Sequence, residues 1–315
     1  MLTSIRGLSA ATLSAGLFLS AAPAFAMEDS SSAATDGIGS EAAISDELIA
    51  ASAAIDGTGA EGTGIVLTTQ IDRANEPLER AESNSVGGSS GLSFSANVAL
   101  TSEYRFRGVD LSGGEIAIQG GFDISHSSGF YVGTWASSLD EDTVGYGSTE
   151  LDIYGGWSGS LTDGLSADIG FIAYTYPDAS GPNSTVEPGN FDYYEFYGSL
   201  GFSLGPVSST VGVAYAPDQD GLDFGGPEHN TYVYTDVSVG ISGTPLTVNG
   251  HLGYTDGSLT FTNDSEAFDW AFSVDVALGG NFSANIAYIE AEGDIAPGAY
   301  DFTDAAIVGT VSASF

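Results

Sequence analysis

The sequence predicts an all-β protein, a transmembrane antiparallel up-and-down β-barrel of about twelve strands. Three observations predict this fold. From Leu92 to Phe315, apolar and polar residues alternate in segments that turn residues interrupt about every ten positions. The connections between segments are alternately short and long, as in outer-membrane barrels. The segments also give an even number of strands, which allows an antiparallel barrel to close.

The individual strands are expected where the alternating segments begin. Their starts lie near Leu92, Glu115, Gly129, Ser148, Leu165, Phe191, Val207, Asn230, Pro245, Ala267, Asn281 and Phe302. In the first strand, one face carries Phe94, Val98, Leu100, Tyr104 and Phe106, and the other carries polar residues. We expect the apolar face to meet lipid and the polar face to meet water.

The region before the barrel has two parts. Residues 1–26 predict a signal peptide, because one early charge, an apolar stretch and Ala24-Phe25-Ala26 precede a cleavage point. Residues 27–91 are rich in Ala, Ser, Gly and acidic residues and hold few aromatic ones, so we expect a disordered leader. After residue 26 no apolar run reaches the length of about 18 residues that a membrane-spanning helix needs, so a membrane role would require a barrel.

The charge is strongly negative. Five Lys and Arg residues oppose 42 Asp and Glu residues, a formal net charge of −37. Nucleic acid is therefore excluded as a partner, because phosphate binding needs a basic face. A solvated acidic surface and an ion-selective pore both explain this acidity. The absence of Cys shows only that no disulfide stabilises the chain.

Two arginines are the only Lys or Arg residues of the predicted barrel. If the first hairpin pairs residues whose numbers add up to 222, Arg107 lies opposite Glu115 on the lumen side. The same register brings apolar residues together outside, for example Phe106 with Ile116. Either these charges form a structural ladder, or they form a selectivity filter.

The lumen-facing residues follow from the alternation. Charged candidates are Glu103, Arg105, Arg107, Glu115, Asp152, Asp168, Glu195, Asp236 and Asp275. Aromatic candidates are Tyr154, Tyr174, Tyr176, Tyr193 and Tyr197, either a stacking track for sugars or ordinary interior tyrosines. Other inward positions, such as Gly156, Gly170 and Gly212, are small. Because small residues cannot fill twelve strands, we expect a narrow water-filled channel.

Several stretches resemble a known family. They are ALTSEYRFRG and QGGFDISHSSGFYVG within Val98 to Gly133, ELDIYGGW from Glu150, and YYEFYGSLGF from Tyr193. The chain from Leu92 to Phe315 is similar to the TorF family of proteobacterial porins. The resemblance implies an outer-membrane barrel with a porin-like role, and it implies no substrate and no catalytic residue.

The expected function is passive diffusion of small hydrophilic solutes, preferably cations, through the bacterial outer membrane. Membrane lipid would surround the barrel, and Phe315 at the end of an amphipathic strand would be read by the insertion machinery. No catalytic residue, metal ligand or cofactor is predicted. One alternative is a structural or calcium-binding barrel with a closed lumen, in which Asp140-Glu141-Asp142 and the loop from Asp218 to Asp223 would hold the ion. Another is a barrel-embedded hydrolase, with the candidates His126, His229 and His251.

Overall fold

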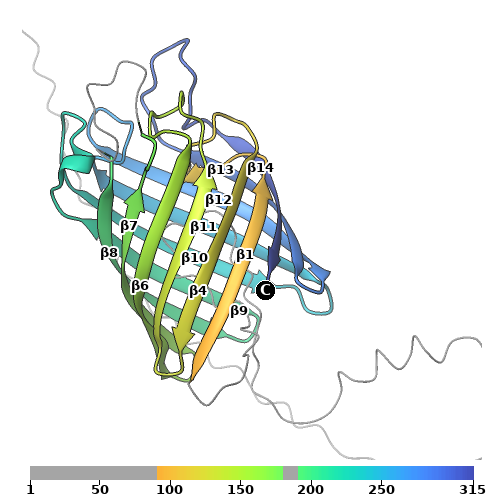
Figure 1. Ribbon diagram of the computed structural model, residues 1–315. Helices are drawn as coiled ribbons and strands as arrows, with labels where there is room; N and C mark the ends of the chain where they lie inside the picture. The colour runs from red at the N-terminus through yellow and green to blue at the C-terminus, as the bar shows by residue number, and fades with distance from the viewer. Residues whose placement is uncertain (1–90, 180–190) are drawn as a thin grey trace, which may run out of the picture. The chain divides into compact units, whose positions relative to one another are not determined.

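The described residues form a closed antiparallel β-barrel (Figure 1). The structure is a computed structural model, and it describes residues 91–179 and 191–315. Twelve strands follow one another around the barrel, and the first pairs with the last. The predicted fold class and strand number are thus confirmed. The signal peptide and almost all of the predicted disordered leader lie outside the described residues.

The barrel strands run as a meander with one interruption. They are β1 (Leu92–Thr101), β4 (Ala117–His126), β5 (Phe130–Ser138), β6 (Thr149–Thr162), β7 (Leu165–Thr175), β8 (Tyr193–Leu204), β9 (Val207–Ala216), β10 (Asn230–Gly240), β11 (Leu246–Gly257), β12 (Glu266–Gly279), β13 (Phe282–Ala291) and β14 (Ala306–Ser314). Two short strands, β2 (Arg105–Phe106) and β3 (Val109–Asp110), pair with each other outside the barrel ladder. A 3₁₀ turn, η3 (Asp220–Leu222), lies in one loop.

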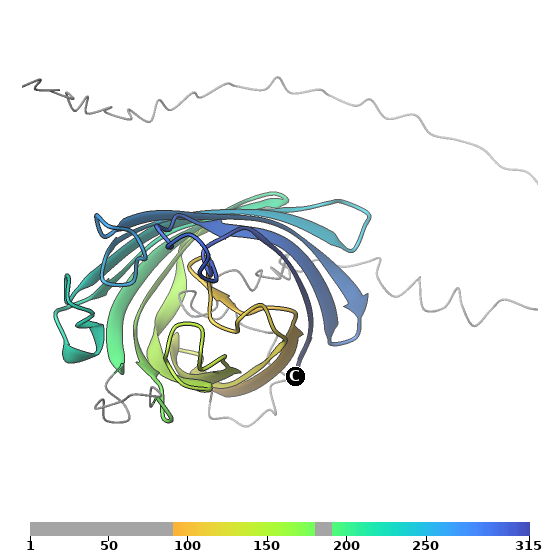
Figure 2. The ribbon, with the colours of Figure 1, turned by 90° about the horizontal axis from the view of Figure 1, so that it is seen from above.

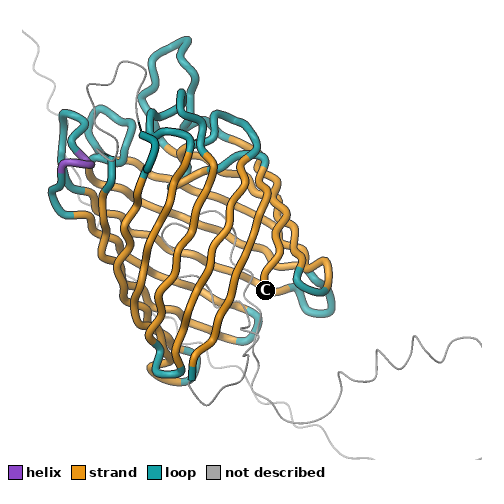
Figure 3. Tube along the Cα trace, viewed as in Figure 1, coloured by secondary structure: helices purple, strands orange, loops and turns teal. Residues whose placement is uncertain are grey.

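The two ends of the barrel differ in their connections (Figure 3). Short turns at residues 127–129, 163–164, 205–206, 241–245 and 280–281 lie at one end, the turn end. Longer connections at 102–116, 139–148, 217–229, 258–265 and 292–305 lie at the other, the loop end. The described residues contain no helix long and apolar enough to cross a membrane.

The two faces of the wall have inverted polarity compared with a soluble protein. Large apolar side chains point outward and are exposed, for example Ile118, Phe272 and Ile307 at 61%, 57% and 68%. Charged and polar side chains such as Asp152 and Asp275 point inward and are buried. An apolar exterior and a polar interior on alternate residues are the pattern of a barrel surrounded by lipid.

The register of the first hairpin differs from the prediction. β1 pairs with β4 from Leu92↔His126 to Thr101↔Ala117, so paired numbers add up to 218 and not to 222. β1 ends at Thr101, and residues 102–116 leave the wall. Tyr104 and Phe106, expected to face lipid, are therefore buried. The faces of the other residues are unchanged, because the register shift of four is an even number.

Inward-facing tyrosines lie flat against the wall over glycines of the neighbouring strand. A Cβ atom built on each glycine would come within 2.3–2.6 Å of an atom of the tyrosine ring or hydroxyl. These directly paired residues are Gly133 with Tyr154, Gly156 with Tyr131, Gly170 with Tyr197, and Gly212 with Tyr234. These glycines therefore make room for tyrosine rings.

This packing can be tested with Gly212→Ala. The new methyl group would stand 2.3 Å from Cζ of Tyr234, so the ring must swing into the lumen. Such overpacking costs about 1–3 kcal/mol of unfolding free energy. Urea unfolding in detergent micelles should show the loss. Gly250→Ala is the matched control, since its Cβ meets nothing within 4 Å. Equal urea midpoints for the two variants would contradict the packing described above.

Candidate functional site in the barrel lumen

Residues 102–116 fold into the barrel as a hairpin, here called the inward hairpin (Figure 2). Arg105 pairs with Asp110 and Phe106 with Val109, and Arg107 and Gly108 form the tip. Both tip residues have positive φ, 49° and 77°, which suits the turn of a tight two-residue hairpin. The tip touches β13, because a Cβ on Gly108 would lie 2.7 Å from Cβ of Ala291.

Apolar side chains seat the inward hairpin against the inner wall. Tyr104, Phe106, Val109 and Leu111 are each at most 9% exposed and belong to one buried cluster with residues of β5 to β9. Ring centroids are 5.4 Å apart for Tyr104 and Trp135, and 5.6 Å apart for Phe106 and Tyr174. Burying such a side chain contributes about 1.5–3 kcal/mol. The inward hairpin is therefore a packed part of the barrel and not a loose loop.

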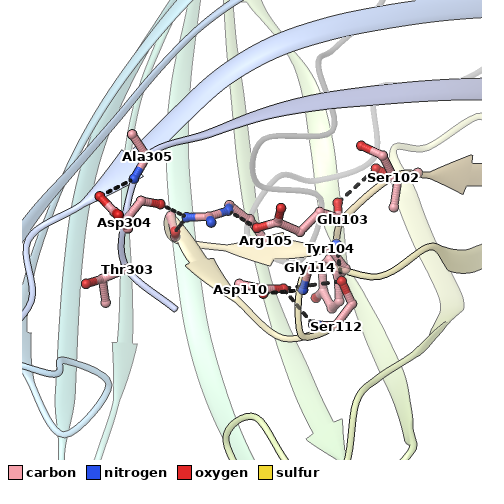
Figure 4. Close-up of polar contacts among 12 residues, drawn as sticks. Ser102, Glu103, Tyr104, Arg105, Asp110, Ser112, Gly114, Thr303, Asp304 and Ala305 are labelled. Atoms are coloured by element: carbon pink, nitrogen blue, oxygen red, sulfur yellow. Dashed lines mark hydrogen bonds and ion pairs between the residues drawn. The ribbon is translucent and has the colours of Figure 1, made fainter. Parts of the chain in front are cut away.

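The carboxylate of Asp110 holds β3, the second strand of the inward hairpin, in place (Figure 4). Asp110 accepts hydrogen bonds from the backbone N–H of Ser112 at 2.8 Å and of Gly114 at 2.6 Å. The hydroxyl of Tyr300, from the loop before β14, donates to the same carboxylate at 2.6 Å. Burial and this carboxylate raise the pKa of Tyr300. Asp110 thus joins the inward hairpin to a loop near the end of the chain.

Arg105 holds β2, the first strand of the inward hairpin, in place. Its Nε donates to Glu103, and its Nη1 donates to the carbonyl oxygens of Gly108 at 2.8 Å and of Asp304 at 2.7 Å (Figure 4). Burial raises the pKa of Glu103, although Arg105 acts in the opposite direction. Both predicted lumen charges are therefore inside the barrel, but they sit on the inward hairpin and not on the wall.

Arg107 forms a buried ion pair with a later strand. Its Nη2 lies 2.8 Å from Oε2 of Glu195 on β8, and the two side chains are 2% and 0% exposed. Its guanidinium carbon lies 4.3 Å from the ring centroid of Tyr232 on β10. The predicted neighbour Glu115 is exposed. The expected Arg107–Glu115 pairing is therefore wrong, because it assumed that β1 continues past Thr101.

The other predicted charges lie on the inner wall. Asp168 accepts a hydrogen bond from the Tyr131 hydroxyl at 2.7 Å. Asp275 accepts one from each side-chain amide of Asn249 and Asn285, both at 2.7 Å. Asp152 is buried. The predicted acidic positions of the wall thus lie inside the barrel, and Asp168 and Asp275 are held by neutral donors.

The five predicted tyrosines also lie inside, mostly covered by the inward hairpin and its neighbours. Tyr174 stacks on Tyr193 with centroids 4.6 Å apart, and Tyr176 contacts Tyr146. These residues and Tyr154 belong to the buried cluster that holds the hairpin. The remaining predicted residue, Tyr197, packs against the same cluster, with its hydroxyl 2.5 Å from that of Tyr131.

A histidine bridge was not among the predicted lumen charges. Nδ1 of His251 on β11 lies 2.6 Å from Oδ1 of Asp236 on β10. Its Nε2 lies 3.0 Å from Oδ1 of Asp269 on β12 and 2.9 Å from the Tyr232 hydroxyl. The direct pairing of Asp236 with His251 was within reach of sequence reasoning, because both positions have inward parity on neighbouring strands.

The residues named for calcium and for hydrolysis lie in different places: in loops, in a turn and on the inner wall. In the described part of the chain, no group of three His, Cys, Asp or Glu residues is placed to hold a metal ion. Asp140 accepts a hydrogen bond from Thr143, and His229 lies 3.3 Å from Asp218 in an exposed loop. His126 contacts Ser128 in a turn.

A small cavity lies beside the inward hairpin. Its lining comes from the hairpin and from β1, β4, β13 and β14, and comprises Thr101, Glu103, Tyr104, Arg105, Gln119, Asn285, Ala287, Ile289, Val308 and Thr310. The lining is largely polar on the β1 and β4 side. This cavity lies between the inward hairpin and the part of the wall formed by β1, β4, β13 and β14.

An apolar exterior, a polar interior and a hairpin folded into the lumen define a transmembrane β-barrel of the outer-membrane type. The chain belongs to the Gcw_chp family, described as a bacterial protein of unknown function, whose sequence profile matches residues 85–315.

Three solved barrels illustrate the structural likeness. A KdgM porin in complex with disordered oligogalacturonate is 9% identical, with a TM-score of 0.45 and coverage of 70% of this chain and 98% of the other. A NanC porin is 11% identical, with a TM-score of 0.45 and coverage of 70% and 98%. The COG4313 outer membrane channel from Pseudomonas putida F1 is 9% identical, with a TM-score of 0.45 and coverage of 72% and 96%. A search of curated protein sequences found no match.

Proposed function

We propose that the protein is a porin-like channel of the bacterial outer membrane, through which small hydrophilic solutes, preferentially cations, diffuse passively. The resemblance to TorF porins and the lipid-facing exterior support the membrane location. Phe315 is exposed, and its N–H donates to Ala96 at the closing seam of the barrel, a position that suits recognition by the insertion machinery.

One observation carries the cation preference. Each arginine of the described chain already contacts a carboxylate, Arg105 that of Glu103 and Arg107 that of Glu195. The inward carboxylate of Asp168 contacts a neutral donor, the Tyr131 hydroxyl, and neither of these two arginines. Carboxylates that line a pore favour cations.

Planar-bilayer recording tests this function directly. The wild-type protein should conduct, and its zero-current potential under a KCl gradient should have the sign of potassium preference. Asp168→Asn keeps the shape of the side chain and removes one lumen charge. A unit charge about 7 Å from a passing ion in water is worth about 0.6 kcal/mol, so the permeability ratio should fall about twofold to threefold.

Asp163→Asn is the matched control for this measurement. Asp163 is exposed in the turn between β6 and β7, where bulk electrolyte screens it, so its neutralisation should leave the potential unchanged. A wild-type potential with the sign of chloride preference would contradict the proposed selectivity. It would mean that the two arginines and not the carboxylates control the ion path.

The inward hairpin favours a second candidate, a structural barrel with a closed lumen. Its apolar residues fill part of the loop-end half of the lumen and are buried in one hydrophobic cluster with the wall. A closed barrel would carry no current in the same recording, while the purified protein would still migrate as a folded barrel on a gel.

A further inference from the structure

Two tyrosine rings meet on the inner wall between β5 and β8. Tyr131 on β5 leans across Gly156, its direct partner on β6. Tyr197 on β8 leans in the opposite direction, across its partner Gly170 on β7. The two glycines are themselves directly paired, so the rings approach each other over them, and the two hydroxyl oxygens lie 2.5 Å apart. We call these four residues the tyrosine floor.

The glycines keep the tyrosine floor flat. A Cβ at Gly156 would lie 2.6 Å from the Tyr131 hydroxyl. A Cβ at Gly170 would lie 2.3 Å from Oη and 2.4 Å from Cζ of Tyr197. Any larger residue at either position would therefore lift a ring off the wall. The Tyr131 hydroxyl also donates to Asp168 at 2.7 Å, which helps to orient its ring. Each ring thus has one face against the wall and the other towards the lumen.

The lumen-side faces of the floor are partly accessible. Tyr131 and Tyr197 are half-buried, whereas Tyr174 and Tyr193, which lie in the buried cluster of the inward hairpin, are 0% and 4% exposed. Both rings of the floor pack against the edge of that cluster. The tyrosine floor therefore begins where the packing of the inward hairpin ends, and a solute that passes the hairpin can reach it.

The face of an aromatic ring attracts cations, because the ring quadrupole places negative charge above the ring plane. The lumen already contains one such contact, in which the guanidinium carbon of Arg107 lies 4.3 Å from the ring centroid of Tyr232. The formal net charge of −37 also favours the approach of cations over that of anions. Alkylated ammonium and guanidinium groups suit a ring face, since the guanidinium group is weakly hydrated and aromatic cages bind quaternary ammonium.

We propose that the tyrosine floor is a subsite for organic cations, small solutes that carry an alkylated ammonium or a guanidinium group. The inference rests on the proposed channel function and names a class of solute for it. Such a solute would place its cationic group on the ring faces of Tyr131 and Tyr197 as it crosses the lumen. A neutral solute of the same size would gain nothing from the ring quadrupole.

Saturation-transfer NMR of the full chain in micelles of a polyoxyethylene detergent tests binding without any current. Irradiation of the aromatic protons should pass saturation to the methyl protons of tetramethylammonium, and much less to those of tert-butanol, a neutral molecule of similar size. Tyr131→Leu should raise the dissociation constant of tetramethylammonium about twofold to fivefold, the contribution of one partly exposed ring. Tyr131→Phe keeps the ring face and should stay close to the wild type.

Tyr215→Leu is the matched control, because Tyr215 is 45% exposed on the outer wall and its loss should leave the dissociation constant unchanged. Should Tyr131→Leu not fold, Tyr197→Leu removes the other ring and carries the same expectation. Equal saturation of tetramethylammonium and tert-butanol would overturn the proposal. Saturation of maltose but not of tetramethylammonium would also overturn it, and would make the floor a sugar site.

Bilayer recording tests whether the subsite lies on the ion path. Tetramethylammonium should reduce the potassium current of the wild type, and the concentration for half-reduction should rise about twofold to fivefold in Tyr131→Leu. Binding in the NMR experiment without any effect on the current would overturn the role in permeation. If the wild-type protein carries no current, the channel function fails, and the NMR result still decides whether the tyrosine floor binds organic cations.

Discussion

Replacing residues 102–116 with an Asn-Gly turn should raise the single-channel conductance several-fold while the barrel still folds. Thr101 and Ala117 are directly paired across β1 and β4, so a two-residue turn can connect them without moving either strand. The strands of the ladder all remain. What disappears is the packed hairpin that occupies the loop-end half of the lumen.

The excision also separates the two proposed functions. A channel in the wild-type protein predicts a current that grows on excision, whereas a closed barrel predicts a current that appears only after excision. Deletion of residues 296–298, in the exposed loop before β14, is the control and should leave conductance unchanged. If a heat-modifiable, folded excision variant conducts like the wild type, the inward hairpin does not obstruct the ion path.

Arg107→Met should lower the free energy of unfolding by about 3–5 kcal/mol, because it leaves Glu195 as a buried charge without its guanidinium partner. The double variant Arg107→Met with Glu195→Gln should recover most of this loss, since a neutral pair of similar volume carries no desolvated charge. Urea titrations of the wild type and of both variants in micelles give the comparison.

Tryptophan fluorescence locates the effect of these substitutions. Trp135 contacts Tyr104, so in a background with Trp157→Phe and Trp270→Phe its emission reports whether the inward hairpin is seated. In Arg107→Met the emission should change at lower urea than the loss of the barrel strands. If the double variant is as unstable as the single variant, side-chain packing and not the buried charge explains the loss.

The sequence alone was sufficient for the strands and for the direction of most side chains. Both follow from the period of two along a strand, which the lipid and the lumen impose together. The same period explains why the inward hairpin was missed. β2 and β3 alternate too, so Tyr104 and Phe106 continue the apolar pattern of β1 after the chain has left the wall.

The register of the first hairpin was predicted wrongly for a related reason. A shift of four residues keeps every side chain on its face, so facial polarity cannot detect it. Apolar neighbours also exist in the observed register, where Leu100 pairs with Ile118 and Phe94 with Ile124. Only the length of the connection distinguishes the two pairings, and sequence alternation does not report that length.

The lumen residues show a second limit of pattern reasoning. Gly170 and Gly212 are small, but their cross-strand neighbours Tyr197 and Tyr234 cover them. The free space above a glycine thus depends on which residue lies opposite it on the neighbouring strand. Identifying that residue requires the strand register. His251 illustrates the same point, because its two acidic partners come from two different strands.

The contacts of the inward hairpin also have a consequence for the order of assembly. The hairpin follows the first strand, but its anchors come much later in the chain: Glu195 is 88 residues away, Tyr300 is 190 and Asp304 is 199. Such distant contacts form only after a large loss of chain entropy. The contacts with Tyr300 and Asp304 can therefore form only when the end of the chain is in place, so the hairpin reaches its full set of contacts late in folding.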